Sequence, residues 1–184
     1  MPELKELLVS QLQDLLHAET QLTSALPKMA QAAHHPKLKE AFEKHLTQTE
    51  MHVERLKQAL SMIDEQPEAQ PCRGMVGLVE EAQETIDEGG DKSPIAADLA
   101  CIAAAQKVEH YEIAAYGTAR TLARQLRLQN VAALLSHTLG EEESADYLLT
   151  AISKPLVQQL TLDDIGEEVD LETVGAGPKS AQKR

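Results

Sequence analysis

The amino-acid sequence predicts an all-α fold, in which four long helices form two antiparallel hairpins. A short crossover helix joins the hairpins, and a C-terminal tail follows them. Apolar residues recur at alternating spacings of three and four in four long stretches of the chain, which is typical of helices with one buried face. Aromatic residues make up only 2% of the sequence and hydrophobic residues 42%, a composition that suits closely packed helices better than a β-sandwich.

The first hairpin is predicted from two stretches of this periodicity. An apolar series indicates a helix over residues 3–33, and Glu19 interrupts that series. Pro36 is suited to open a second helix, which we expect to end near residue 64. The buried face of the second helix contains three polar residues in succession: His45, Thr49 and His52.

A linker and a short helix separate the two hairpins. Residues 65–73 contain two prolines and favour an irregular connection. An amphipathic stretch over residues 74–88 ends at two glycines and predicts the crossover helix. Ser93 is suited to cap a long helix that reaches about residue 125.

The last helix of the second hairpin is predicted over residues 129–153, and Pro155 disturbs the pattern just after it. We therefore place the helical domain at residues 1–155 and a tail at residues 156–184. The tail shows no helical period from about residue 160, and we expect it to be mobile or wrapped around a partner.

Carboxylates occupy positions on the buried faces of the second hairpin. Glu109 and Glu112 are three residues apart on an otherwise small and apolar face, while Glu142 and Asp146 continue the apolar spacing of the last helix. Glu143 lies one position aside. A buried carboxylate without a partner costs several kcal/mol, so these residues predict either bound cations or contact with water.

These polar residues are expected to lie at one depth within the helices. In an antiparallel helix pair, residues equally far from the turn lie at the same height, because both helices rise 1.5 Å per residue. Glu19 then lies level with Thr49 and His52, and Glu109 and Glu112 lie level with residues 141–146. Carboxylates and imidazoles facing each other inside four helices are typical of di-iron and di-manganese proteins.

Charge and composition exclude several other classes. Acidic residues outnumber basic ones 30 to 17, giving a net charge of −13, which disfavours nucleic acid or an anionic membrane as a partner. The two cysteines fit a reducing compartment, and the sequence shows no apolar signal core or membrane-spanning run. We therefore expect a cytoplasmic protein.

Several motifs of the sequence carry a family resemblance: Ala18–Leu22, Ala25–Ala30, His45-Leu46 with Thr49, Cys72-x-x-Met75, Glu109–Gly117 and Glu142–Asp146. They resemble the YciF/YciE stress-response family, a group of ferritin-like, rubrerythrin-like di-metal proteins. The resemblance covers residues 3–153. It implies a ferritin-like four-helix bundle, a homodimer, iron or manganese at the site, and chemistry with peroxide or O₂.

The family pattern implies a set of metal ligands. One glutamate and a Glu-x-x-His pair are expected from each hairpin. The sequence departs from this pattern twice, because Thr49 stands in place of a glutamate and Asp146 in place of a histidine. Thr49 either empties one metal position or leaves it to His45 or a water molecule. The residues at the positions of the pattern, including one extra carboxylate, are Glu19, Thr49, His52, Glu109, Glu112, Glu143 and Asp146.

Some of these assignments have alternatives. Glu142 competes with Glu143 for the ligand role, since the apolar spacing favours the first and the family motif the second. His45 is either a ligand or a hydrogen-bonded core histidine. Tyr116 lies one turn from Glu112 and either packs there or hydrogen-bonds a ligand carboxylate.

Three functional classes follow from the sequence. The first is an enzyme that cleaves peroxide or O₂ at two metal ions, and the second is a metal-binding module without turnover. The third is a structural helical protein without metal, whose buried carboxylates are protonated or paired with basic side chains. Carboxylate and imidazole ligands suit iron and manganese, and the absence of thiolates disfavours structural zinc.

Overall fold

The computed structural model describes residues 2–174, with side chains described through residue 166. None of these residues forms a strand, which confirms the predicted all-α fold. The helices are α1 (Pro2–Ala32), α2 (Pro36–Ser61), α3 (Arg73–Glu88), the short 3₁₀ helix η1 (Gly89–Asp91), α4 (Pro94–Gln125) and α5 (Gln129–Val174).

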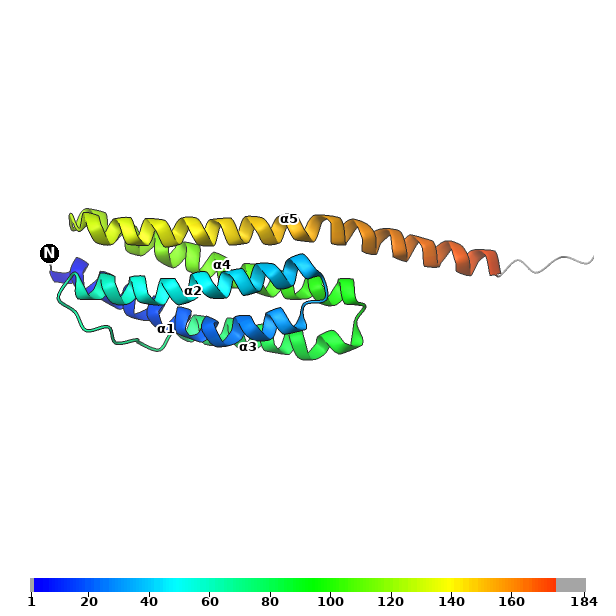
Figure 1. Cartoon of the computed structure of the whole chain (residues 1–184), viewed down its shortest axis with the longest axis horizontal. Helices are drawn as coiled ribbons and strands as arrows, with labels where there is room; N and C mark the ends of the chain where they lie inside the picture. Colours follow the sequence, from blue (N-terminus) through cyan, green and yellow to red (C-terminus); the bar gives the residue numbers. More distant parts are fainter. Residues whose placement is uncertain (1, 175–184) are drawn as a thin grey trace, which may run out of the picture.

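The four long helices lie side by side in two pairs (Figure 1). α1 packs against α2 and α4 packs against α5, and each pair is joined by a short turn. The pairs meet through contacts of α2 with α5 and of α1 with α4. α3 lies outside this group, along α1 and α4. The interior enclosed by the four long helices is therefore the place where a site can be buried.

The predicted helix starts have local causes. The Ser93 hydroxyl accepts a hydrogen bond from the backbone N–H of Ala96 at 3.2 Å, and proline follows at the first helical position. The Cys72 sulfur accepts from the N–H of Met75 and caps α3 in the same way. Arg127 adopts a left-handed φ of 62° in the turn between α4 and α5.

Polar residues lie at the junction of two apolar clusters. In α2, Leu38 and Phe42 belong to one cluster and Leu56 and Leu60 to the other. The same order of apolar, polar and apolar residues holds along the other three long helices. The buried residues between the clusters, which we call the polar layer, are Glu19, His45, Thr49, His52, Glu109, Glu112 and Glu142.

The last helix differs from its predicted length. α5 continues to Val174, whereas the sequence placed its end near residue 153, and Pro155 lies within it. Ile152 and Leu156 are both buried in the apolar core on either side of the proline, so packing holds the helix through the missing backbone hydrogen bond. The expected tail of residues 156–184 is thus helical in its first part, and residues 175–184 lie outside the described chain.

Asp98 is a buried carboxylate with a structural role. Its two oxygens accept hydrogen bonds from the backbone N–H groups of His34 and His35, each at 2.8 Å, and so anchor the turn between α1 and α2 on α4. We expect Asp98→Ala to lower the free energy of unfolding by about 2 kcal/mol, because two N–H groups lose their partner. Urea denaturation measures this loss. Asp91→Ala, at an exposed position, is the control, and equal stability of the two variants would contradict the anchoring role.

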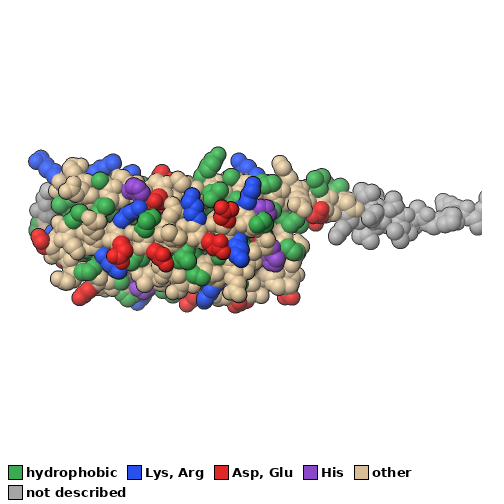
Figure 2. All heavy atoms as spheres, in the orientation of Figure 1, with side chains coloured by type: hydrophobic (Ala, Val, Ile, Leu, Met, Phe, Trp, Pro, Cys, Tyr) green, Lys and Arg blue, Asp and Glu red, His purple; other side chains and the backbone are tan. Residues whose placement is uncertain are grey.

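Acidic and basic side chains are interspersed over the face shown in Figure 2. None of the helices within the described range is long and apolar enough to cross a membrane.

Candidate metal centre

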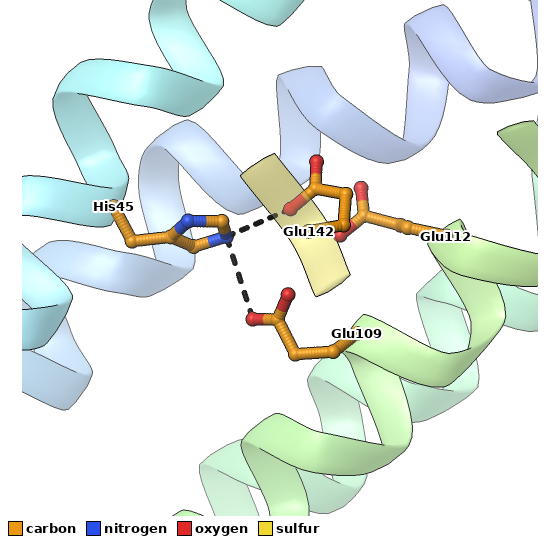
Figure 3. A group of neighbouring side chains, drawn as sticks. All are labelled: His45, Glu109, Glu112 and Glu142. Carbon is orange, nitrogen blue, oxygen red and sulfur yellow. Dashed lines mark ion pairs between the residues drawn. The ribbon is translucent and has the colours of Figure 1, made fainter. Parts of the chain in front are cut away.

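One half of the polar layer is a group of four buried side chains, contributed by three helices (Figure 3). His45 comes from α2, Glu109 and Glu112 from α4, and Glu142 from α5. Each offers one ligand atom, and these atoms all lie within 4.8 Å of one another. The His45 Nε2 atom is 3.4 Å from Glu109 Oε1 and 3.5 Å from Glu142 Oε2. The spacing is that of donor atoms surrounding a single ion.

A second group within the polar layer consists of Glu19, His52 and the same Glu142. The His52 Nδ1 atom lies 2.9 Å from Glu142 Oε1 and 3.3 Å from Glu19 Oε1. The Tyr116 hydroxyl donates a hydrogen bond of 2.5 Å to Glu19 Oε1. Since Glu142 belongs to both groups, its two oxygens are placed between two adjacent candidate positions for metal.

The polar layer is short of hydrogen-bond partners. Within the described part of the chain, twelve buried side-chain nitrogen and oxygen atoms make no hydrogen bond, and ten of them belong to this layer. Both oxygens of Glu112 and both of Glu142 are among them. Buried polar atoms are normally paired, because an unpaired one loses its hydration without compensation. Four of the ten atoms, on His45, His52 and Glu142, lie at ion-pair distance from a carboxylate or imidazole of the same layer, whereas neither Glu112 oxygen makes such a contact within the described residues. Such a concentration of atoms without hydrogen bonds fits a group of ligands for divalent cations.

Burial and crowding shift the pKa values of the carboxyl groups upward. Burial, followed by the charge of Glu142, raises the pKa of Glu109 well above its ordinary value. Burial and the charge of Glu19 do the same for Glu112. Burial is also the main cause for Glu19, whose pKa rises to about 7 although His52 opposes the shift. Without metal, the polar layer therefore retains protons that a divalent cation would displace.

The pKa values of the two histidines shift in opposite directions. Burial lowers the pKa of His45, so its ring is neutral and one of its nitrogens is available as a ligand. Burial also disfavours charge on His52, but the carboxylates of Glu142 and Glu19 outweigh it and raise the His52 pKa to about 10. In the metal-free protein, His52 is thus the cation that the surrounding carboxylates hold.

Glu141 orients His52 from outside the polar layer. Its Oε2 atom lies 3.0 Å from His52 Nε2, and the same oxygen forms an ion pair with Arg55. Burial acts to raise the pKa of Glu141, but Arg55 and His52 lower it to about 2. A carboxylate bound to the outer ring nitrogen fixes the Nδ1 atom toward the interior, as is common for histidine ligands.

Glu141 and its ion pair with Arg55 were not predicted from the sequence. Glu141 lies beside the buried face of α5 and its side chain is 19% exposed, so the apolar spacing does not mark it as a buried position. The signal was the run of three glutamates at 141–143, which places a carboxylate on both flanks of the buried position at the predicted level.

Three residues predicted as ligands lie outside both groups. Glu143 is exposed, because consecutive residues of a helix point about 100° apart and the neighbouring Glu142 takes the buried position. Asp146 lies at the edge of the α4–α5 contact, where it accepts a hydrogen bond from Gln106 Nε2 at 2.8 Å. Thr49 is buried in the polar layer, with a hydroxyl that makes no hydrogen bond to the described residues.

Fold and site together define an all-helical protein with a buried cluster of carboxylates and histidines between its long helices. The chain belongs to the family described as "Domain of unknown function (DUF892)", whose family model matches residues 3–161. Protein YciF of Escherichia coli strain K12 is 44% identical over 154 residues, which are 83% of this chain and 92% of YciF. The resemblance to the YciF-like family is thereby confirmed.

Solved structures agree with this assignment. The crystal structure of the E. coli stress protein YciF is similar with a TM-score of 0.81 and 42% identity, covering 86% of this chain and 99% of that one. YcfI from Rhodopseudomonas palustris, described as a candidate structural protein, is 36% identical with a TM-score of 0.76, over 80% of this chain and 92% of that chain. A Xanthomonas campestris protein at 20% identity and a TM-score of 0.67 shares the fold, over 88% of this chain and 98% of its own.

Proposed function

We propose that this protein is a ferritin-like di-metal protein that binds two iron or manganese ions and reacts with peroxide or O₂ under stress. The observation that carries the proposal is the pair of buried ligand groups that share Glu142. Carboxylates and neutral imidazoles are ligands that iron and manganese accept, and neither group contains a thiolate that would favour structural zinc.

The proposed ligands divide between two positions. His45, Glu109, Glu112 and Glu142 would hold one ion, and Glu19, His52 and Glu142 the other. A bound pair of redox-active ions would supply electrons to an oxidant. The chain itself positions the ligands through the outer partners of the second group: Tyr116 on Glu19 and Glu141 on His52. The apolar clusters on both sides separate the layer from solvent along the helix axes.

Metal loading and oxidant consumption test this proposal. Apo-protein is loaded anaerobically with Fe(II) or Mn(II), desalted, and analysed by inductively coupled plasma mass spectrometry. We expect about two ions per chain, one for each ligand group. Addition of hydrogen peroxide to the Fe(II) form is expected to oxidise both ions, followed by absorbance. Protein that retains no iron or manganese would overturn the proposal.

Glu141→Ala is expected to weaken metal binding roughly 10- to 100-fold, because His52 loses the carboxylate that fixes its ring. Competition with a chromophoric chelator measures the affinity. Glu54→Gln removes one negative charge from an exposed position of α2 and is the matched control. Equal affinities of the two variants would show that Glu141 does not position a ligand.

Turnover separates the proposed enzyme from a metal-binding module. An enzyme is expected to consume peroxide continuously with a reductant present, whereas a module stops after one stoichiometric oxidation. A structural role, as in the description of YcfI, is the second candidate. It predicts that added Mn(II) leaves the melting temperature unchanged, since only a ligand of the native state stabilises it.

The homodimer implied by the family resemblance stays a prediction. α5 carries exposed apolar side chains that a second copy of the chain would cover: Tyr147 at 74%, Leu162 at 69% and Ile165 at 52% exposure. Light scattering on the purified protein measures the mass, and a monomer at micromolar concentration would contradict this expectation.

A further inference from the structure

A small cavity leads from the surface to the polar layer between α2 and α5. Its volume is about 60 Å³, and its inner end is formed by His45 and Glu109. Ala145 and Leu149 of α5 are among its wall residues, and Lys44 and Leu148 lie at its solvent-exposed rim. The cavity thus connects solvent with one of the two proposed metal positions, the one drawn in Figure 3.

The inner end of this passage carries polar atoms that make no hydrogen bond to the described residues. His45 is only 6% exposed, and neither of its ring nitrogens makes a hydrogen bond to the described residues. The Oε2 atom of Glu109 is also unpaired. Protein interiors contain few voids, and a buried polar atom beside a void normally has a hydrogen-bond partner. A space with apolar walls and a polar end therefore suits a small polar ligand that reaches the ions.

The volume of the passage limits what it can admit. A cavity of about 150 Å³ accepts benzene, and in the same measure about 15 Å³ holds one water molecule. The 60 Å³ space is less than half the first volume and about four times the second. Hydrogen peroxide, with two heavy atoms, fits this space, whereas an organic hydroperoxide with an aromatic ring does not.

We propose that the passage between α2 and α5 is the route by which hydrogen peroxide reaches the metal centre, and that it excludes bulky organic hydroperoxides. This inference rests on the proposed function and names the substrate class of that site. Hydrogen peroxide would accept one electron from each of two Fe(II) ions bound there, its O–O bond would break, and two protons would complete two water molecules.

Filling the passage tests the route. Ala145→Phe places a ring in the wall, and Ala133→Phe places the same ring at an exposed position of α5 away from the cavity. Each protein is loaded with Fe(II) and mixed by stopped flow with hydrogen peroxide, cumene hydroperoxide or O₂. For the wild type and Ala133→Phe, we expect the rate of oxidation by hydrogen peroxide to exceed the rate with cumene hydroperoxide at least roughly tenfold. We expect Ala145→Phe to slow the reaction with hydrogen peroxide by about the same factor while its metal content stays unchanged.

A second readout needs no metal. Crystals of the metal-free protein are placed under xenon pressure, since apolar cavities take up xenon. We expect a xenon peak beside His45 in the wild type and none in Ala145→Phe. Absence of the peak in the wild type would overturn the passage even if the protein binds and oxidises iron.

The remaining outcomes separate the two proposals. Unchanged peroxide oxidation in a fully loaded Ala145→Phe protein would overturn the route alone, as would faster oxidation by cumene hydroperoxide or O₂ than by hydrogen peroxide in the wild type. A wild type that binds no metal would overturn the proposed function, and the route with it, whatever the xenon result.

If Ala145→Phe does not fold, Ser144→Cys at the exposed rim is compared before and after reaction with a bulky maleimide. The native Cys72 and Cys101 are buried, so the label goes to the introduced thiol. A label that leaves the rate unchanged would overturn the route.

Discussion

Glu142→Gln is expected to abolish stoichiometric binding at both metal positions, reducing the metal content from two ions per chain to less than about one tenth of that value. Glu142 is fully buried and is the one residue common to both ligand groups. A neutral amide offers neither the charge nor the second anionic oxygen that a bridging position requires. Mass spectrometric metal analysis after anaerobic loading and desalting measures the effect.

The matched control is Glu143→Gln, because Glu143 is the next residue of the same helix and is exposed. It removes the same charge and is expected to bind metal like the wild type. The metal-free Glu142→Gln protein is expected to be less stable than the wild type at neutral pH, since the buried, protonated His52 ring loses the carboxylate that lies 2.9 Å from its Nδ1 atom. If Glu143→Gln lost the metal and Glu142→Gln kept it, the assignment of the bridging residue would be wrong.

The metal-free protein is expected to lose stability as the pH rises above about 4.5. Glu19 has an ordinary pKa of 4.5 and a folded pKa of about 7, and those of Glu109 and Glu112 are also raised. A raised carboxyl pKa means that the folded state binds more protons than the unfolded state, so stability falls with pH across this interval. We expect the melting temperature to fall by roughly 10 °C between pH 5 and pH 8.

His52 acts in the same direction. Its pKa rises from 6.5 to about 10 on folding, so its contribution is complete below pH 6.5 and is lost as the pH rises through 10. Two groups act oppositely in acid. The lowered pKa of His45 removes stability below pH 6.5, and the pKa of about 2 for Glu141 does so as the pH falls below 4.5. Above pH 4.5, only His45 among these groups makes stability rise with pH, whereas three carboxyl groups and His52 make it fall.

Metal is expected to reverse this trend, because binding requires deprotonated carboxylates and therefore strengthens as the pH rises. Saturating Mn(II) at about 100 times its dissociation constant adds about 2.7 kcal/mol of stability. Scanning calorimetry with Mn(II) and with a chelator, from pH 5 to pH 8, measures both curves. Parallel curves, or a metal-free protein that gains stability above pH 5, would contradict the buried cluster.

Much of the fold could be predicted because the apolar spacing and the caps act locally. The starts of α2, α4 and α5 follow from Pro36, from Ser93 with its following proline, and from the turn at Arg127. The end of α5 could not be predicted, because a proline inside a helix is tolerated only where tertiary packing compensates. That packing involves Ile152 and Leu156, whose burial no local pattern determines.

The depth of the polar residues could be predicted because both helices of a hairpin rise equally per residue. The contact of His52 with Glu19 at 3.3 Å agrees with this argument. The choice among Glu141, Glu142 and Glu143 needed the rotation of α5 about its axis, which depends on side-chain packing. Apolar spacing pointed to Glu142, whereas the family motif pointed to Glu143, which faces solvent.

Some buried polar residues serve the fold and not the site. Asp98 continues the buried face of α4 but binds the turn between α1 and α2, a role that its spacing alone did not reveal. Tyr111 donates a hydrogen bond to Asp14 and contacts the sulfur of Cys72, which fastens the linker before α3 to α1 and α4. Such partners come from distant parts of the chain, so only the folded structure identifies them.

Anomalous diffraction from crystals grown with Mn(II) tests the central claim most directly. We predict two anomalous peaks inside the protein, separated by the carboxylate of Glu142. One peak would be bound by His45, Glu109 and Glu112, and the other by Glu19 and His52. An interior without anomalous density, with manganese bound only to surface carboxylates, would contradict the account.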